Sequence, residues 1–323
     1  MMRFFVVALF VLSLCFASAQ SLRVGLGYLP DVQFAPFYLG VMGGLYEEAG
    51  LEVEFQHGFV TELYPLLAQG KLDFVVGDAE DIILLRSQDE EGAAFKYLMA
   101  LYQNVPNALF SLEEAEIADI TDLAGKRVGI PGLFGTSYTS LQAILQAANL
   151  SEDDIILEQI GFTQVEAVLS GRVDVAMGFI NNEPIVLEAQ GLAVNVIPAG
   201  DYNPSAGNGV VTTETMLANP DLVQRFVQAS QRAMALTVRE PELAFEAAHA
   251  YVENMGDDRM AVLLTSADLY TSELTDENGI GYTDLAGWEA TLELLKANRR
   301  VDTELDASAF FTNEFIDPTI TAE

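Results

Sequence analysis

One pattern of hydrophobic and polar positions occurs twice along the chain. Residues 70–77 read GKLDFVVG, and residues 171–178, which lie 101 positions later, read GRVDVAMG. Each copy follows an apolar stretch and precedes polar or acidic residues, so the pattern predicts a helix, a glycine stop, a buried strand and a loop. Ligands of open α/β sheets lie at the carboxyl ends of the strands. Two such units therefore predict two lobes that face each other across a cleft.

Strands and helices are predicted to alternate around both copies. Residues 22–28 are expected to form a strand, 51–55 alternate between apolar and polar as a half-exposed strand does, and 61–69 are expected to form a helix. The order restarts at Asp122 with a turn, a strand and a glycine-rich loop that leads into another helix. This alternation predicts an α/β protein with two Rossmann-like lobes and mostly parallel sheets.

The chain is expected to cross between the lobes twice. We interpret the segments near 105–115 and 198–208 as the crossings, and 209–213 as a strand that returns to the first lobe. In the remainder, helices are predicted over 222–239, 243–254, 259–267 and 288–298, because apolar residues recur there at helical spacing. The expected boundaries are 20–112 and 205–323 for lobe one with its C-terminal helices, and 113–204 for lobe two.

The first 19 residues have the pattern of a secretory signal peptide. A single positive charge precedes an apolar run, and Ala17-Ser18-Ala19 offers a cleavage site of small residues before Gln20. We therefore expect a periplasmic or extracellular protein. The only cysteine, Cys15, lies in this segment and follows Leu14 rather than a small residue, which favours its removal over lipid attachment. A mature chain without thiols excludes disulfides, cysteine nucleophiles and cysteine–metal sites.

The chain is strongly acidic, with a formal net charge of −33. The acidic residues are scattered, as on a solvated surface, and do not form a tail. Nucleic acid is excluded as a partner because no basic patch exists to displace its counterions. Lysine is scarce, and we take this together with the acidity as a hypothesis that the protein works in a saline medium, where salt screens self-repulsion.

Two phrases near the N-terminus carry a resemblance to a known family. Residues 27–38 (GYLPDVQFAPFY) and 44–53 (GLYEEAGLEV), followed later by 122–129 (DLAGKRVG), resemble periplasmic substrate-binding proteins of ABC importers. The branch includes binders of thiamine pyrimidine precursors, riboflavin, alkanesulfonates and nitrate. The resemblance implies a type II periplasmic binding protein that closes on a small molecule and then docks, as a monomer, on a membrane permease. It implies no cofactor and no catalysis.

The first loop departs from the pattern of the pyrimidine binders. In that group this loop tends to carry Pro-Asn and, three residues later, His, whereas the chain has Asp31 and Phe34 at those positions. The run from 32 to 38 is closer to riboflavin-type binders. The ligand stays open between a thiamine pyrimidine precursor and a riboflavin-like vitamin.

Aromatic residues near the predicted strand ends are candidates for stacking on a flat heterocycle. They are Tyr28, Phe34, Tyr38, Phe59, Tyr102 and Phe134. The alternative for Tyr38, and for its neighbour Phe37, is an ordinary core position on a helix. Loops at strand ends more often carry function, which favours Tyr28 and Phe34 as site residues.

Acidic residues that follow the predicted strands of lobe one are candidates for accepting hydrogen bonds from ring N–H groups or hydroxyls. These are Asp31, Asp78 and Glu80. The alternatives are a helix N-cap for Asp78 and plain surface charge for Asp31.

Lobe two offers two further groups of polar candidates. Gly135, Thr136 and Ser137 open a helix, where backbone N–H groups favour anions or carbonyl oxygens, although a simple N-cap is the alternative. Asn181, Asn182 and Glu183 follow the second repeat and mirror the acids of lobe one; their alternative is a turn before Pro184. The second group suits a polar ring edge because amides both donate and accept.

Other functions fit the sequence less well. A sulfonate or nitrate needs a cationic pocket, and the basic residues nearest to the predicted site, Arg86, Lys126 and Arg127, are expected outside it. The two histidines lack metal-ligand spacing, and no nucleophile with a base can be assembled for a secreted cleft enzyme. The family also resembles a pyrimidine synthase that relies on cysteines, which the mature chain lacks. A ligand-sensing domain would use the same fold, but no signalling segment is attached.

Overall fold

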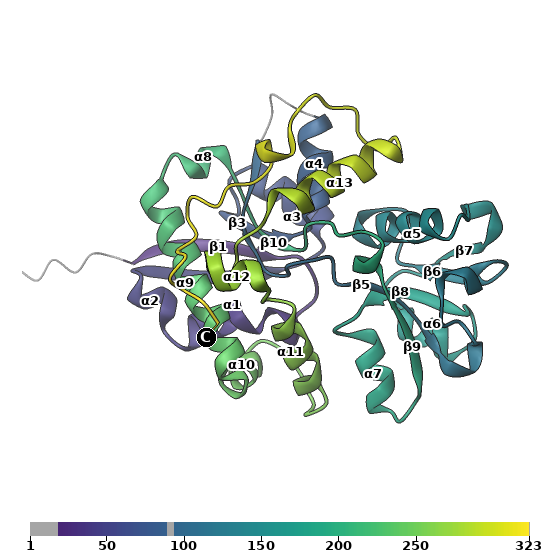
Figure 1. Ribbon diagram of the computed structural model, residues 1–323. Coiled ribbons are helices and arrows are strands. Elements are labelled where there is room, and N and C mark those ends of the chain that lie inside the picture. Colours follow the sequence, from purple (N-terminus) through teal and green to yellow (C-terminus); the bar gives the residue numbers. More distant parts are fainter. Residues whose placement is uncertain (1–18, 89–93, 323) are drawn as a thin grey trace, which may run out of the picture.

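Two five-stranded sheets organise the protein, as seen in a computed structural model that describes residues 19–88 and 94–322 (Figure 1). The predicted signal peptide falls outside the described residues except for Ala19. In sheet order, lobe one contains β2 (Leu51–His57), β1 (Gln20–Leu26), β3 (Phe74–Gly77), β10 (Gly209–Thr213) and β4 (Phe95–Ala100). Lobe two contains β7 (Ile156–Gln159), β6 (Arg127–Ile130), β8 (Val175–Phe179), β5 (Asn107–Leu112) and β9 (Val194–Pro198).

The two sheets have the same plan. In lobe one, β10 runs antiparallel to both β3 and β4, while β1 is parallel to β2 and β3. In lobe two, β5 takes the place of β10 and runs antiparallel to β8 and β9, while β6 is parallel to β7 and β8. Each lobe thus has one reversed strand, which enters it from the other lobe. The predicted α/β fold is confirmed, and the sheets are mixed, because two of the four strand pairings in each sheet are antiparallel.

The repeated phrase occupies the same place in both lobes. Asp73 accepts the backbone N–H of Arg23 at 2.7 Å, and the Arg23 guanidinium donates to the carbonyl of Gly70 at 2.8 Å. In lobe two, Asp174 accepts the backbone N–H of Arg127 at 2.8 Å, and Arg127 donates to the carbonyl of Gly171 at 2.6 Å. Both glycines have a φ near +65°, a conformation that favours glycine at the end of a helix. In both lobes the repeat thus forms the short connection between the end of a helix and the start of a strand, β3 in lobe one and β8 in lobe two.

The α-helices cover both faces of each sheet. Lobe one contains α1 (Ala35–Met42), α2 (Leu45–Glu48), α3 (Val60–Ala68), α4 (Ala79–Gln88), α8 (Glu214–Leu217), α9 (Pro220–Arg239), α10 (Pro241–Ala248), α11 (Arg259–Asp268), α12 (Glu273–Asn278) and α13 (Leu285–Ala297). Lobe two contains α5 (Gly135–Ala147), α6 (Gln164–Leu169) and α7 (Glu183–Ala189). Short 3-10 helices span Val32–Phe34, Glu113–Ala115, Ile120–Leu123, Glu152–Asp154, Ala199–Asp201 and Ala307–Ala309. None of the described helices is long and apolar enough to cross a bilayer.

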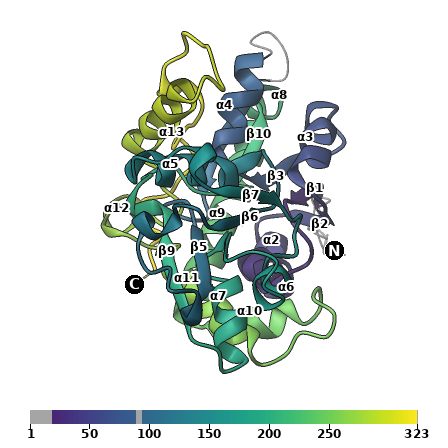
Figure 2. The ribbon, with the colours of Figure 1, turned by 90° about the vertical axis from the view of Figure 1, so that its right-hand side faces the viewer.

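Alternate residues of a strand pack into separate cores. Phe74 and Val76 of β3 join the core shared with α1 and α9, whereas Val75 points to the opposite face and joins α3, α4 and α13. Lobe two divides in the same way, because Leu109 of β5 packs with α5 while Phe110 packs with α6 and α7. Figure 2 looks onto lobe two and shows α5 on one side of the sheet and α6 and α7 on the other. The period of two along each strand thus holds helices on both faces.

Three expectations about element bounds differ from the structure. The first crossing runs over 101–106, because β5 already lies in sheet two, where Leu109 and Phe110 are fully buried, instead of in a crossing near 105–115. The segment between β9 and β10 spans 199–208, where the sequence interpretation has the return crossing over 198–208. The first strand ends at Leu26, which leaves Tyr28 in the loop beyond it. The helix α12 was not expected.

Candidate ligand-binding site

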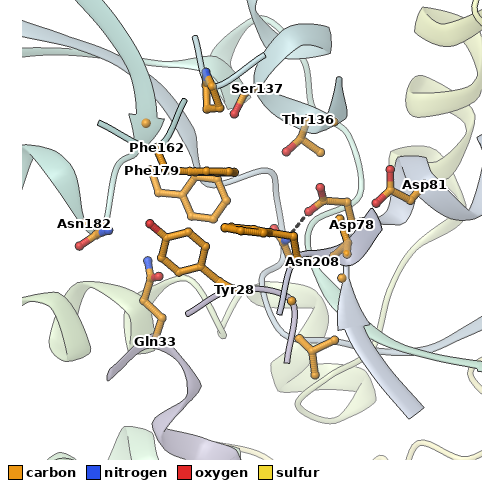
Figure 3. A pocket seen from close by; sticks show the side chains of 18 of the residues that line it. Tyr28, Gln33, Asp78, Asp81, Thr136, Ser137, Phe162, Phe179, Asn182 and Asn208 are labelled. Carbon is orange, nitrogen blue, oxygen red and sulfur yellow. Dashed lines mark hydrogen bonds between the residues drawn. The ribbon is translucent and has the colours of Figure 1, made fainter. Parts of the chain in front are cut away.

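A cavity of about 300 Å³ lies between the two lobes (Figure 3). Its walls come from the carboxyl ends of strands, with Gly27 and Tyr28 after β1, Gly77 and Asp78 at the end of β3, and residues 134–137 after β6. The parallel strands place these ends at one edge of each sheet, and the two edges face each other. The volume is at the lower end of the range for small-molecule sites.

Three aromatic rings meet across the boundary between the lobes. Phe59, just before α3, stacks on Phe162, just before α6, with ring centroids 4.9 Å apart and planes inclined by 8°. Tyr28 contacts both rings edge-on, at 6.4 Å from Phe59 and 5.7 Å from Phe162. Phe134, about half exposed, also lines the cavity. This wall offers ring faces and edges on which a planar ligand can stack.

Carboxyl groups line one end of the cavity. The Asn208 side-chain amide donates a hydrogen bond to Asp78. Burial, followed by repulsion from Glu80, raises the pKa of Asp78 to about 7. Burial and the charges of Asp78 and Glu80 raise the pKa of Asp81 well above its usual value. One buried oxygen of Asp81 has no hydrogen-bond partner among the described residues, so this end can accept hydrogen bonds.

Amide groups line another part of the cavity. Gln33 is only 6% exposed, and among the described residues its side-chain nitrogen has no hydrogen-bond partner. In Figure 3 it points toward Tyr28, with Asn182 of lobe two nearby. Asn182 accepts a hydrogen bond from Arg259 at 2.9 Å, and Glu183 accepts the backbone N–H of Phe179 at 2.8 Å. A donor remains at Gln33 for the polar edge of a ligand.

Most of the predicted site residues line this one cavity. They are Tyr28, Phe34, Phe59, Asp78, Tyr102, Phe134, Gly135, Thr136, Ser137, Asn182 and Glu183. Their role in binding stays a prediction, but the structure brings residues from six separate chain segments together around one space.

Two predicted acidic residues are held by arginines and do not line the cavity. Asp31 caps the Val32–Phe34 turn by accepting the backbone N–H of Gln33 at 3.0 Å, and it pairs with Arg259 at 2.5 Å. Glu80 is 2% exposed and pairs with Arg300 at 3.1 Å. Burial raises the pKa of Glu80 despite the attraction of Arg300.

Two further predicted residues are also placed elsewhere. Tyr38 is fully buried in the core of lobe one and stacks on Tyr251 with centroids 4.3 Å apart, so the alternative of a helix core position is correct. Asn181 is fully buried beside the cavity, where its side-chain amide donates to the Tyr102 hydroxyl at 3.1 Å and to Ser266 at 2.7 Å. These bonds join Asn181 of lobe two to lobe one.

Sequence reasoning missed several residues that line the cavity. The polar and aromatic ones are Gln33, Thr61, Asp81, Phe162, Gln164, Phe179 and Asn208. Phe162 had a usable signal, because it follows Gly161 just after the strand predicted over 155–160, in the same kind of loop as Phe134. Asp81 lies three residues after Asp78, a spacing that brings side chains to one face of a helix.

Positive charge is absent from the described lining of the cavity, which contains no Lys, Arg or His. Arg86 lies over the Phe310 ring and donates to the carbonyl of Ala309 at 2.7 Å, away from the cavity. Across residues 19–88 and 94–322, no group of three His, Cys, Asp or Glu residues is placed to hold a metal ion. The electrostatics of the cavity thus come from carboxyl groups.

Comparison with known proteins identifies the family. Residues 31–244 match the family model described as NMT1/THI5 like. The chain belongs to the NMT1/THI5-like family. It is 36% identical over 305 residues to the riboflavin-binding protein RibY of Chloroflexus aurantiacus, an alignment covering 92% of this chain and 86% of that protein.

More distant members of the family differ in what their names describe. A formylaminopyrimidine-binding protein of Halalkalibacterium halodurans is 22% identical, with 91% of this chain and 90% of that protein covered. A 4-amino-5-hydroxymethyl-2-methylpyrimidine phosphate synthase of Legionella pneumophila is 21% identical, with 91% and 92% covered. The family therefore contains proteins named for binding and proteins named for synthesis.

Solved structures share the fold. The periplasmic aliphatic sulphonate binding protein SsuA of Escherichia coli superposes with a TM-score of 0.71 at 16% identity, covering 90% of this chain and 91% of that one. A ligand-binding component of an ABC-type import system from Staphylococcus aureus also gives a TM-score of 0.71, at 14% identity, covering 94% and 100%. The expected periplasmic-binding-protein fold is confirmed.

Proposed function

We propose that this protein is an extracytoplasmic solute-binding protein that captures a flavin-like aromatic vitamin and delivers it to an ABC importer. The observation that carries the proposal is the aromatic wall of Tyr28, Phe59 and Phe162 between two lobes. The 36% identity to a riboflavin-binding protein over nearly the whole chain supports the same ligand class.

The lining suits a flat ring with a polar edge. Ring faces of the aromatic wall contribute about 0.5–1.5 kcal/mol for each stacked pair beyond the burial of apolar area. The free donor of Gln33 and the amide of Asn182 are placed for a ring edge that carries carbonyl and N–H groups. A planar ring inserted between Phe59 and Phe162 needs their planes about 7 Å apart, two van der Waals layers.

This insertion requires the lobes to move. The crossings over 101–106 and 199–208 connect the sheets and are the natural hinges for such opening. The lobe boundaries expected from the sequence belong to this proposal, with the first moved to the crossing over 101–106. Export through the N-terminal signal peptide, a monomeric state and docking on a permease complete it.

We propose binding without catalysis, although some relatives are named as synthases. The only cysteine of the chain is Cys15, in the segment predicted to be removed, so the mature protein offers no thiol for the chemistry that the resemblance implies for the synthase. The described lining contains no histidine or lysine to act as the base for its Thr136 and Ser137 hydroxyls.

A thiamine pyrimidine precursor is the second candidate ligand. The cavity of about 300 Å³ is small, which favours a single ring, and a relative at 22% identity is named for binding a formylaminopyrimidine. A sulfonate or nitrate fits less well, because carboxyl groups and no cations line the described cavity.

Native purification followed by absorbance and mass spectrometry tests the ligand class directly. Calorimetry then compares riboflavin, 4-amino-5-hydroxymethyl-2-methylpyrimidine and an alkanesulfonate. We expect riboflavin to bind best and Phe162→Ala to weaken it about tenfold, the equivalent of one lost ring contact of roughly 1.4 kcal/mol. Leu169→Ala, on the following helix and equally exposed at 43% against 42%, is the matched control. Tighter binding of the alkanesulfonate would refute the proposal.

A further inference from the structure

Helix α5 of lobe two lacks a cap from its own segment. Its N-cap residue, Phe134, makes no side-chain hydrogen bond, and its first turn contains no acidic residue. The N-terminal N–H groups of a helix need acceptors and favour an anion. In a cleft protein this position is open to a negatively charged ligand, unless the protein fills it.

The Asp78 carboxylate of lobe one fills this position at the N-terminus of α5. Hydrogen bonding with Thr136, in the first turn of α5, lowers the pKa of Asp78 against the larger effect of burial. The Asp78 Oδ2 atom lies at ordinary contact distance from this helix end, 3.8 Å from the point where a Cβ atom of residue 135 would stand, and the φ of +65° at residue 135 favours glycine there. Asn208, in the return crossing, adds a further donor. Asp78 therefore occupies the place that an anionic ligand would take at this helix end.

We propose that Asp78 occupies the anion position at the N-terminus of α5 and makes the site select an uncharged ligand over its phosphate ester. This rests on the proposed function, because it states which form of the vitamin the cavity takes. Asp78 is thus a specificity-determining residue, and the ligand class is the dephosphorylated, hydroxyl-bearing compound.

The surroundings of Asp78 strengthen this selection. Asp81 lines the same end of the cavity, with one buried oxygen that has no partner among the described residues. The cation that acts on Asp81, Arg300, is already bound to Glu80 and to Thr139. A hydroxyl of the ligand can donate a hydrogen bond to the free oxygen of Asp81. At pH 8 a phosphate ester offers only acceptors and adds a charge close to −2 beside Asp78. An ester at this end is therefore repelled.

Calorimetry at pH 8 with riboflavin and riboflavin 5′-phosphate tests the selection. We expect the wild-type protein to bind riboflavin about 100-fold more tightly than the phosphate, the effect of placing two charges a few ångströms apart in a partly desolvated site. Asp78→Asn keeps the shape of the side chain but removes its charge. It should lower the ratio of the riboflavin affinity to the riboflavin 5′-phosphate affinity about tenfold or more. Asp153→Asn, at an exposed acid of lobe two in the 3-10 helix Glu152–Asp154, changes the net charge equally and should leave this ratio of affinities unchanged.

The outcomes separate this inference from the proposed function. Equal affinity of the wild type for both flavins, or an unchanged ratio in Asp78→Asn, overturns the role of Asp78 while the flavin proposal stands. Asp78→Ser serves the same comparison if the Asn variant does not fold. Binding of neither flavin overturns the proposed ligand; the inference is then measured on 4-amino-5-hydroxymethyl-2-methylpyrimidine and its phosphate. Absence of binding by all four compounds overturns both.

Discussion

Removing the arginine that compensates a buried carboxylate should destabilise lobe one in a pH-dependent way. Arg300→Met leaves Glu80, which is 2% exposed, without its partner at 3.1 Å. Breaking a buried pair from one side costs about 3–5 kcal/mol, because a charge stays buried without compensation. The Arg300 side chain is 19% exposed, so water offsets part of the loss, and we expect roughly 3 kcal/mol.

Urea unfolding at pH 8, followed by tryptophan fluorescence, measures this loss. Trp288 is the only tryptophan and lies fully buried against Tyr97 and Phe311, so its emission reports on lobe one. With a slope of about 3 kcal/mol per molar urea, the midpoint should fall by about 1 M.

A double variant and a lower pH distinguish a buried, compensated Glu80 from an ordinary surface pair. Glu80→Gln combined with Arg300→Met removes both charges and should recover most of the loss. The deficit of Arg300→Met alone should shrink as the pH falls toward 5, because the pKa of Glu80 is already raised by burial and its protonation ends the penalty. A loss under about 0.5 kcal/mol, typical of an exposed pair, or a double variant no better than the single one, would show that Glu80 is not held by Arg300 as described.

Three further predictions concern charge and the contact between lobes. The pKa of Asp78 rises from 3.8 to about 7 on folding, so between these pH values the folded state binds a proton that the unfolded state lacks. The contribution of Asp78 to the free energy of unfolding therefore falls as the pH rises through this range. Asp78→Asn should remove this pH dependence, which amounts to at most roughly 4 kcal/mol, in urea unfolding. Asp174→Asn should lower the unfolding free energy more than Asp73→Asn in the same urea assay, since the guanidinium partner of Asp174 is 2.5 Å away and that of Asp73 is 3.6 Å away; equal losses would contradict this. Asn181→Ala should weaken riboflavin binding about five- to tenfold in calorimetry although it does not line the cavity, because the buried Tyr102 hydroxyl loses a bond between the lobes; an unchanged affinity would contradict this.

The sequence predicted the parts of the fold that local pattern determines. The repeated phrase located β3, β8 and the loops after them, because a glycine stop and a buried strand leave a signal within ten residues. The same logic placed Tyr28, Phe134 and Asn182 at the cavity. The strand β5 lies where the sequence analysis expected a crossing, and only its pairing with β8 and β9 shows that residues 107–112 belong to a sheet.

The misassigned site residues depend on partners that are distant in sequence. Asp31 and Glu80 both follow strands, as a ligand-binding carboxylate would. Arg259 lies 228 residues after Asp31, and Arg300 lies 220 residues after Glu80. No local pattern indicates that these arginines return to bind the two acids. Asp78 differs from its neighbour Glu80 only because the helix beginning at Ala79 turns Glu80 away from the cleft.

The position of β10 has a consequence for the order in which the chain can fold. All five strands of lobe two come from one continuous stretch, Asn107–Pro198, whereas β10 enters the middle of the other sheet only at Gly209–Thr213. As the polypeptide emerges from its N-terminus, the second lobe can complete its sheet while the first still has a gap between β3 and β4. The unpaired edges of that gap are open to other chains until residue 213 arrives. Lobe one, whose first strands are synthesised before lobe two, is therefore the lobe that completes its sheet last.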